Sequence, residues 1–185
     1  GIAGTITALS LLLGNHTIYL STWEIVPAVL VSFRIDALSA FFLLIICGVA
    51  VAVSIYSMGY VTEYYHKKNV GLLGAGLNLF LLSMVAVVTV DNGVVFLVAW
   101  ELMSLVSFFL VMYEHENQEV RKAGYIYVVM THMGTVFISL SFLALFLFAG
   151  SFSFVEFHNS SAEFPSWLKN LVFLMALIGF GTKAG

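Results

Sequence analysis

The stretch VVFLVAWELMSLVSFFLV, residues 94–111, is apolar except for Glu101, Ser104 and Ser107. A helix of about 20 apolar residues spans the hydrocarbon core of a bilayer. An ionised side chain at the centre of a bilayer costs roughly 2.5–3.5 kcal/mol, so such residues are rare and usually functional. The stretch therefore predicts a transmembrane helix that carries a functional carboxylate.

The composition of the whole chain also indicates a membrane protein. Of its 185 residues, 61% are hydrophobic and only 9% are charged, and the mean hydropathy is +1.04. A soluble domain carries about 25% charged residues. The single cysteine, Cys47, excludes an internal disulfide and a cluster held by several cysteines.

Apolar runs recur along the chain, and they predict an all-α fold, a bundle of transmembrane helices. We expect these helices at about residues 1–20 (truncated), 37–60, 71–90, 93–113, 124–149 and 171–185 (truncated). The first residue is not Met and no basic signal peptide precedes the first run, so we expect an internal fragment of a longer protein. Four of the basic residues indicate that two of the loops are cytoplasmic, namely Lys67, Lys68, Arg121 and Lys122.

Three ionisable side chains lie deep within the apolar runs: Glu101, His132 and Lys183. Glu101 suits a proton carrier, because burial favours the neutral carboxyl and a nearby cation favours the ionised form. The alternative is a carboxylate that only satisfies a neighbouring helix. His132 is either a relay group, since imidazole titrates near neutrality, or a core histidine held by one hydrogen bond.

Lys183 lies in the segment LIGFGTKAG, where Gly179, Gly181 and Gly185 surround it. Glycines at this density allow a helix to bend or break, and unwound backbone at membrane depth must face protein or water. A desolvated lysine there loses its proton readily. The alternative is that Lys183 belongs to a loop.

Three segments together resemble a known family: DNGVVFLVAWELMSLVSFFLV (residues 91–111), RKAGYIYVVMTHMGT (121–135) and GFGTKAG (179–185). In order and spacing they are similar to the antiporter-like membrane subunits of respiratory complex I and group 4 hydrogenases. The similarity is greatest to the large membrane subunit of the hydrogenase-4/formate hydrogenlyase type, and sodium/proton antiporter subunits are more distant. Complex I relatives often carry arginine and aspartate where this chain has His132 and Thr135, which favours the hydrogenase-type branch.

The resemblance implies a fold and a mechanism. It implies an inverted-repeat architecture whose second half is absent here, and a broken seventh helix near the end of the chain. It also implies that Glu101 and Lys183 pair inside the membrane and, with His132, relay protons for a redox-driven complex. A sodium/proton antiporter subunit and a structural anchor without ion transport are the alternatives.

The implied partners are other membrane subunits, a peripheral redox arm and the lipid bilayer, in a bacterial or archaeal cytoplasmic membrane, with no nucleic acid. The chain has no haem motif, cluster ligands or phosphate-binding loop. We therefore expect no cofactor, no metal and no catalytic redox site on this chain.

Overall fold

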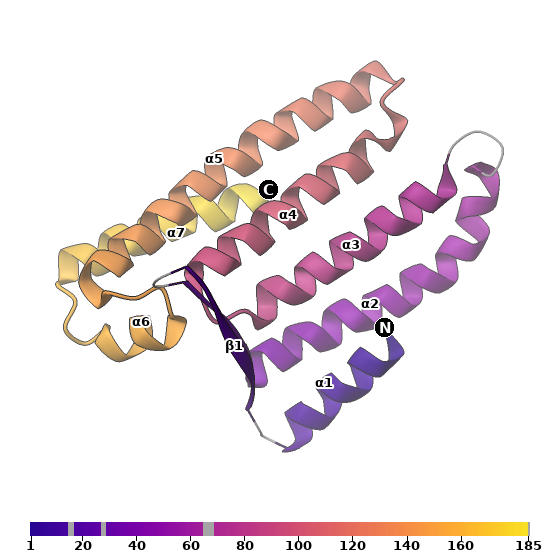
Figure 1. Ribbon diagram of the computed structural model, residues 1–185. Coiled ribbons are helices and arrows are strands. Elements are labelled where there is room, and N and C mark those ends of the chain that lie inside the picture. Colours follow the sequence, from indigo (N-terminus) through magenta and orange to yellow (C-terminus); the bar gives the residue numbers. More distant parts are fainter. Residues whose placement is uncertain (15–16, 27–28, 65–68, 185) are drawn as a thin grey trace.

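Helices make up most of the chain, as predicted for an all-α bundle. The structure, a computed structural model, describes residues 1–14, 17–26, 29–64 and 69–184 (Figure 1). Its α-helices are α1 (Ile2–Gly14), α2 (Ala37–Tyr60), α3 (Val70–Thr89), α4 (Gly93–Val111), α5 (Gln118–Ala149), α6 (Phe154–Ser160) and α7 (Ser166–Ala184). Two strands, β1 (Ile18–Val26) and β2 (Val29–Ile35), and two 3-10 helices, η1 (Val61–Tyr64) and η2 (Met112–Glu114), complete the described elements. The predictions that involve Lys67, Lys68 and Gly185 fall outside the described residues.

Four helices in the described part are long and apolar enough to cross a membrane: Ala37–Tyr60, Val70–Thr89, Gly93–Glu114 and Gln118–Ala149. They correspond to the four full-length runs of the sequence. Their outer surfaces expose many large apolar side chains, including Phe41, Leu82 and Phe109. Apolar surface on this scale requires a lipid or protein environment.

Consecutive helices pack side by side, from α1 through α2, α3 and α4 to α5, and α7 packs against α5 (Figure 1). The buried centre of this arrangement consists of Trp100 and Met103 on α4 and Ile138 on α5. The ring of Phe180 on α7 meets that of Trp100 edge to face, with centroids 5.3 Å apart. Helix α4 therefore lies between α3 and α5, and its Trp100 also contacts α7.

A β-hairpin replaces the last part of the first predicted segment. Helix α1 ends at Gly14, and β1 pairs antiparallel with β2 from Ile18 opposite Ile35 to Val26 opposite Val29. The prediction of a helical run to about residue 20 is therefore wrong at its end. The physical reason is local, because VLVSFRI alternates large apolar with mixed residues at a period of two, which suits a strand.

The hairpin joins one end of the bundle, which we call the hairpin end. The Asp91 backbone N–H donates to the Ser32 carbonyl oxygen at 2.8 Å, and the Gly93 N–H donates to the Phe152 carbonyl oxygen at 2.8 Å. Asn92 begins α4, because its side-chain oxygen accepts the backbone N–H groups of the first turn. The start of α4 is thus attached to β2 on one side and to the α5–α6 connection on the other.

Helices α5 and α7 are longer at their starts than predicted, and α7 has no break between Ser166 and Ala184. Asn117 caps α5, so that this helix starts at Gln118 rather than near residue 124. Helix α7 starts at Ser166 rather than near residue 171 and continues through Gly179 and Gly181 to Ala184. The expected break is absent from this described helix, because Gly179 allows close contact with α5, as shown below.

Candidate functional site

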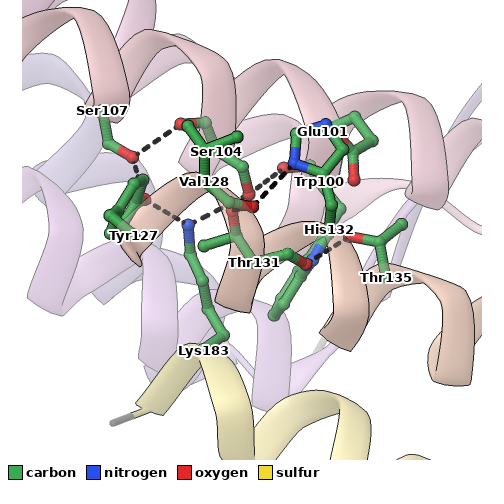
Figure 2. A network of polar contacts seen from close by, with 10 residues as sticks. All are labelled: Trp100, Glu101, Ser104, Ser107, Tyr127, Val128, Thr131, His132, Thr135 and Lys183. Atoms are coloured by element: carbon green, nitrogen blue, oxygen red, sulfur yellow. Dashed lines mark hydrogen bonds and ion pairs between the residues drawn. The ribbon is translucent and has the colours of Figure 1, made fainter. Parts of the chain in front are cut away.

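Helix α4 places Glu101, Ser104 and Ser107 at successive positions three residues apart, which puts them on one side of the helix. Ser104 is only 2% exposed, and its hydroxyl donates to the Trp100 carbonyl oxygen at 3.0 Å. The Ser107 hydroxyl donates to the Ser104 carbonyl oxygen at 2.9 Å. A column of polar groups therefore runs along an otherwise apolar helix (Figure 2).

Glu101 is paired with His132 of α5. The Nε2 atom of His132 lies 3.7 Å from Oε2 of Glu101, which is longer than a hydrogen bond. The other carboxylate oxygen, Oε1, is buried and has no hydrogen-bond partner among the described residues. The Glu101 side chain is 29% exposed and that of His132 is 50% exposed. One oxygen of the carboxylate thus faces a histidine beyond hydrogen-bond distance, and the other has no hydrogen-bond partner among the described residues.

The second nitrogen of His132 restricts where protons can reside. Its Nδ1 lies 3.0 Å from the Val128 carbonyl oxygen, and a carbonyl can only accept. Nδ1 therefore carries a hydrogen in this contact. In a neutral imidazole Nε2 then has no hydrogen, so its lone pair faces the Glu101 carboxylate. The two groups attract only when one further proton resides on Glu101 or on Nε2.

Lys183 reaches the same region from α7, but it does not contact Glu101. Its ammonium donates to the Tyr127 hydroxyl oxygen at 2.7 Å and to the Ser104 hydroxyl oxygen at 3.0 Å. The Tyr127 hydroxyl in turn contacts that of Ser107. Figure 2 shows Lys183 extending from α7 toward the two hydroxyls rather than toward the carboxylate.

The expected Glu101–Lys183 pair is therefore not formed in this structure. The three residues proposed from the sequence lie close together, but Glu101 is paired with His132 and Lys183 is bound by hydroxyl groups. The physical reason is that the hydroxyl oxygens of Tyr127 and Ser104 lie next to the Lys183 ammonium and accept its hydrogen bonds. The relay roles of Glu101, His132 and Lys183 stay predictions.

Close packing of α7 against α5 allows Lys183 to reach the site. A Cβ atom added to Gly134 on α5 would lie 2.8 Å from the Gly179 carbonyl oxygen, and one added to Gly179 would lie 2.6 Å from Ile138 Cγ1. Only glycine permits this approach, as in other closely packed membrane helices. Of the glycines that suggested a broken helix, Gly179 thus serves helix contact.

A groove of about 340 Å³ opens beside Glu101 on the surface of α5. Its polar lining consists of Glu101, His132, Thr135 and Ser139. The last three recur at helical spacing along α5 from His132 toward the hairpin end. Polar side chains along a transmembrane helix are typical of an ion or proton pathway.

Sequence reasoning missed Ser104, Ser107 and Tyr127. The two serines could have been found from their spacing of three residues from Glu101, which indicates a shared helix side. The sequence does not single out Tyr127, because nothing in its neighbourhood distinguishes it from the nearby Tyr125. Only the packing of α5 against α4 and α7 brings Tyr127 to the lysine.

Comparison with known proteins gives concordant matches. A family model described as "NADH:quinone oxidoreductase/Mrp antiporter, TM" matches residues 90–185, and one described as "NADH-Ubiquinone oxidoreductase (complex I), chain 5 N-terminus" matches residues 27–69. Hydrogenase-4 component B of Escherichia coli K12 is 40% identical over 152 residues, which cover 82% of this chain and 22% of that protein. An uncharacterized protein of Mycobacterium tuberculosis H37Rv is 33% identical over 185 residues, 100% of this chain and 28% of that protein.

Two solved structures share the fold. A chain of the Mrp complex from Dietzia superposes with a TM-score of 0.78 at 21% identity, over 97% of this chain and 20% of that one. A chain of an archaeal membrane-bound sulfane sulfur reductase superposes with a TM-score of 0.77 at 14% identity, over 96% of this chain and 36% of that one. The present chain thus spans about a quarter of the length of the curated relatives that it matches. It is an integral, multi-pass membrane protein, and it belongs to the family of NADH:quinone oxidoreductase and Mrp antiporter transmembrane subunits.

Proposed function

We propose that this chain is part of a proton-translocating membrane subunit of a redox-driven complex, and that Glu101, His132 and Lys183 carry the protons. The observation that supports the proposal best is the arrangement of Glu101 and His132. With Nδ1 of His132 bound to a carbonyl, the pair is attractive only when it holds one additional proton. A pair with this property loads and releases a proton at a defined position.

The groove beside the pair supports access from one side. Thr135 and Ser139 lie beyond His132 along α5, and their hydroxyls both donate and accept hydrogen bonds. Such groups, together with water, conduct protons by exchanging hydrogen bonds. In the proposed path a proton moves along this groove and is taken up by the Glu101–His132 pair.

Lys183 supplies the electrostatic control. A cation within about 4–6 Å of a carboxylate favours its ionised form. When the ammonium approaches Glu101, the carboxylate releases its proton, and when the ammonium withdraws, the carboxylate takes one up. Transport across this part of the membrane then requires no bound cofactor on this chain.

The named relatives support a proposal for the partners. Hydrogenase-4 component B is by name one component of a hydrogenase, and both solved neighbours belong to membrane complexes. We infer that the full-length protein assembles with other membrane subunits, and that a peripheral arm carries the redox centres and drives transport.

A sodium/proton antiporter subunit is the second candidate. The similarity to the Mrp antiporter family model and to a chain of the Mrp complex favours it. The same charged residues would then serve an exchange of sodium for protons. Dependence of proton movement on sodium distinguishes this candidate from the first.

The test is proton translocation by the intact parent complex in sealed vesicles, with redox turnover recorded in the same samples and sodium present or absent. Glu101→Gln keeps the size of the side chain and removes its proton-carrying capacity. Glu119→Gln is the matched control, since that carboxylate on α5 is 79% exposed and pairs only with Lys122 among the described residues. We expect Glu101→Gln to lose proton translocation and the control to keep it. Translocation at the wild-type rate in Glu101→Gln would contradict the proposal.

A further inference from the structure

The hydrogen bonds around Lys183 have a common direction. The Ser104 hydroxyl donates to the Trp100 carbonyl, and the Ser107 hydroxyl donates to the Ser104 carbonyl. The Ser107 oxygen can therefore accept the hydrogen of the Tyr127 hydroxyl, with which it is in contact. Every hydroxyl hydrogen then points away from the lysine, so that Ser104 and Tyr127 both present lone pairs to it.

Lone pairs from two oxygens suit a charged ammonium, which can only donate. The face of the Tyr127 ring adds a second attraction, since Lys183 Nζ lies 5.0 Å from the ring centroid. Ser104 is almost fully buried, which strengthens these contacts by excluding water. The arrangement is thus a binding position for the cationic form of Lys183.

A second acceptor for the same ammonium lies one helical turn away. Ser104 follows Glu101 by three residues on α4, a rise of about 4.5 Å. Oε1 of Glu101 is buried and without a hydrogen-bond partner in the described part of the chain. The lysine side chain is a flexible four-carbon stem, so a change of rotamer moves its ammonium from the hydroxyls toward the carboxylate.

We propose that Tyr127 and Ser104 form a holding position in which Lys183 is kept charged and away from Glu101, and that Tyr127 is a positioning residue that sets the balance between the two positions. The inference deepens the proposed proton transport and rests on it. No covalent bond forms or breaks in this exchange, because only the lysine side chain moves. While Lys183 is at the hydroxyls, Glu101 can take up a proton; when it moves to Oε1, the carboxylate is held ionised.

Few ionisable side chains lie near Glu101 among the described residues, which makes the effect measurable. Helix α5 contributes His132, α7 contributes Lys183, and α3 has no ionisable side chain. Loss of the holding position should therefore act on Glu101 through Lys183, while the contact with His132 is retained.

The experiment is the pH profile of proton translocation by the parent complex in vesicles, with Tyr127→Phe as the test variant. Removing the hydroxyl releases Lys183 toward Glu101, so that a higher proton concentration is needed to load the carboxylate. We expect the pH of half-maximal translocation to fall by about one unit or more, as for a carboxylate that gains a cationic neighbour. Tyr125→Phe is the control, because Tyr125 lies on the same helix, is 73% exposed and should leave the profile unchanged.

Ser104→Ala provides an independent test that keeps the phenol, and it should move the profile in the same direction. It also decides the matter if Tyr127→Phe does not assemble. A wild-type pH of half-maximal translocation in the assembled Tyr127→Phe complex would overturn the inference. If Tyr127→Phe does not assemble, the same result in Ser104→Ala would overturn it. If Glu101→Gln abolishes translocation in the same preparation, the proposed function stands although the holding position fails. If Glu101→Gln translocates normally, the proposed function itself fails.

Discussion

A methyl group at the closest approach of α5 and α7 should weaken the contacts of Lys183 with its hydroxyl partners. In Gly134→Ala the new Cβ would overlap Thr182 Oγ1 and would lie 2.8 Å from the Gly179 carbonyl oxygen. The Thr182 hydroxyl cannot simply turn away, since it donates to the same carbonyl at 2.8 Å. The backbone of α7 must therefore retreat from α5.

The size of the retreat follows from contact distances. A carbon and an oxygen need about 3.4 Å or more, so the Gly179 carbonyl must retreat by about 0.6 Å and the closer Thr182 hydroxyl by more. Lys183 follows Gly179 by one helical turn and moves with it. Its hydrogen bonds to Tyr127 and Ser104, 2.7 Å and 3.0 Å long, are then strained and weakened. Overpacking of this kind also costs about 1–3 kcal/mol of stability.

The assay combines proton translocation in vesicles with thermal unfolding of the purified parent complex. Gly181→Ala is the matched control, because it adds the same methyl group to α7 where no atom lies within 4 Å. We expect Gly134→Ala to lower both translocation and thermal stability, and Gly181→Ala to retain both. Equal behaviour of the two variants would refute the claim that glycine contact positions Lys183.

Three further predictions concern other contacts. His132→Gln should slow proton translocation by about tenfold, about 1.4 kcal/mol, because an amide cannot hold the additional proton; unchanged rates at equal assembly would exclude His132 from the relay. Burial raises the pKa of the Asp91 carboxyl at the hairpin end, although nearby Arg34 opposes this. A raised pKa means that the folded state binds this proton more tightly than the unfolded state does, so the ionised Asp91 carboxylate lowers the stability of the fold at pH 7. Below the ordinary pKa of an aspartate the carboxyl is protonated in both states, and this loss disappears. Asp91→Asn should therefore raise the melting temperature at pH 7, and this gain should shrink toward pH 4. A gain that does not depend on pH would show that the buried charge is not its cause. Asn92→Ala should cost about 0.5–2 kcal/mol by removing the cap of α4, measured by denaturation of the parent protein, and Asn92→Asp should restore most of it.

The sequence was sufficient to predict the long helices, because apolar runs of spanning length with few charges cross a bilayer as helices. It also identified the ionisable residues of the site, since Glu101, His132 and Lys183 stand out against an apolar background. The family resemblance is confirmed by the matching family models.

The sequence predictions were less successful where short-range and tertiary signals compete. The alternation in β2 does not stand out, because the polar residues between the first two runs resemble a loop. Gly179 was interpreted as a helix breaker, whereas the neighbouring α5 uses it for contact. The partners of Lys183 depend on how three helices pack, and no spacing along one helix reports that arrangement.

The central claim is that Glu101 gains and loses a proton during transport, and infrared difference spectroscopy of the parent complex during turnover tests it most directly. We predict a carboxyl signal that appears and disappears with turnover in the wild type, persists in Glu119→Gln and is absent from Glu101→Gln. A carboxyl signal of the same size in Glu101→Gln would contradict the claim, and so would a wild type that pumps protons without any carboxyl change.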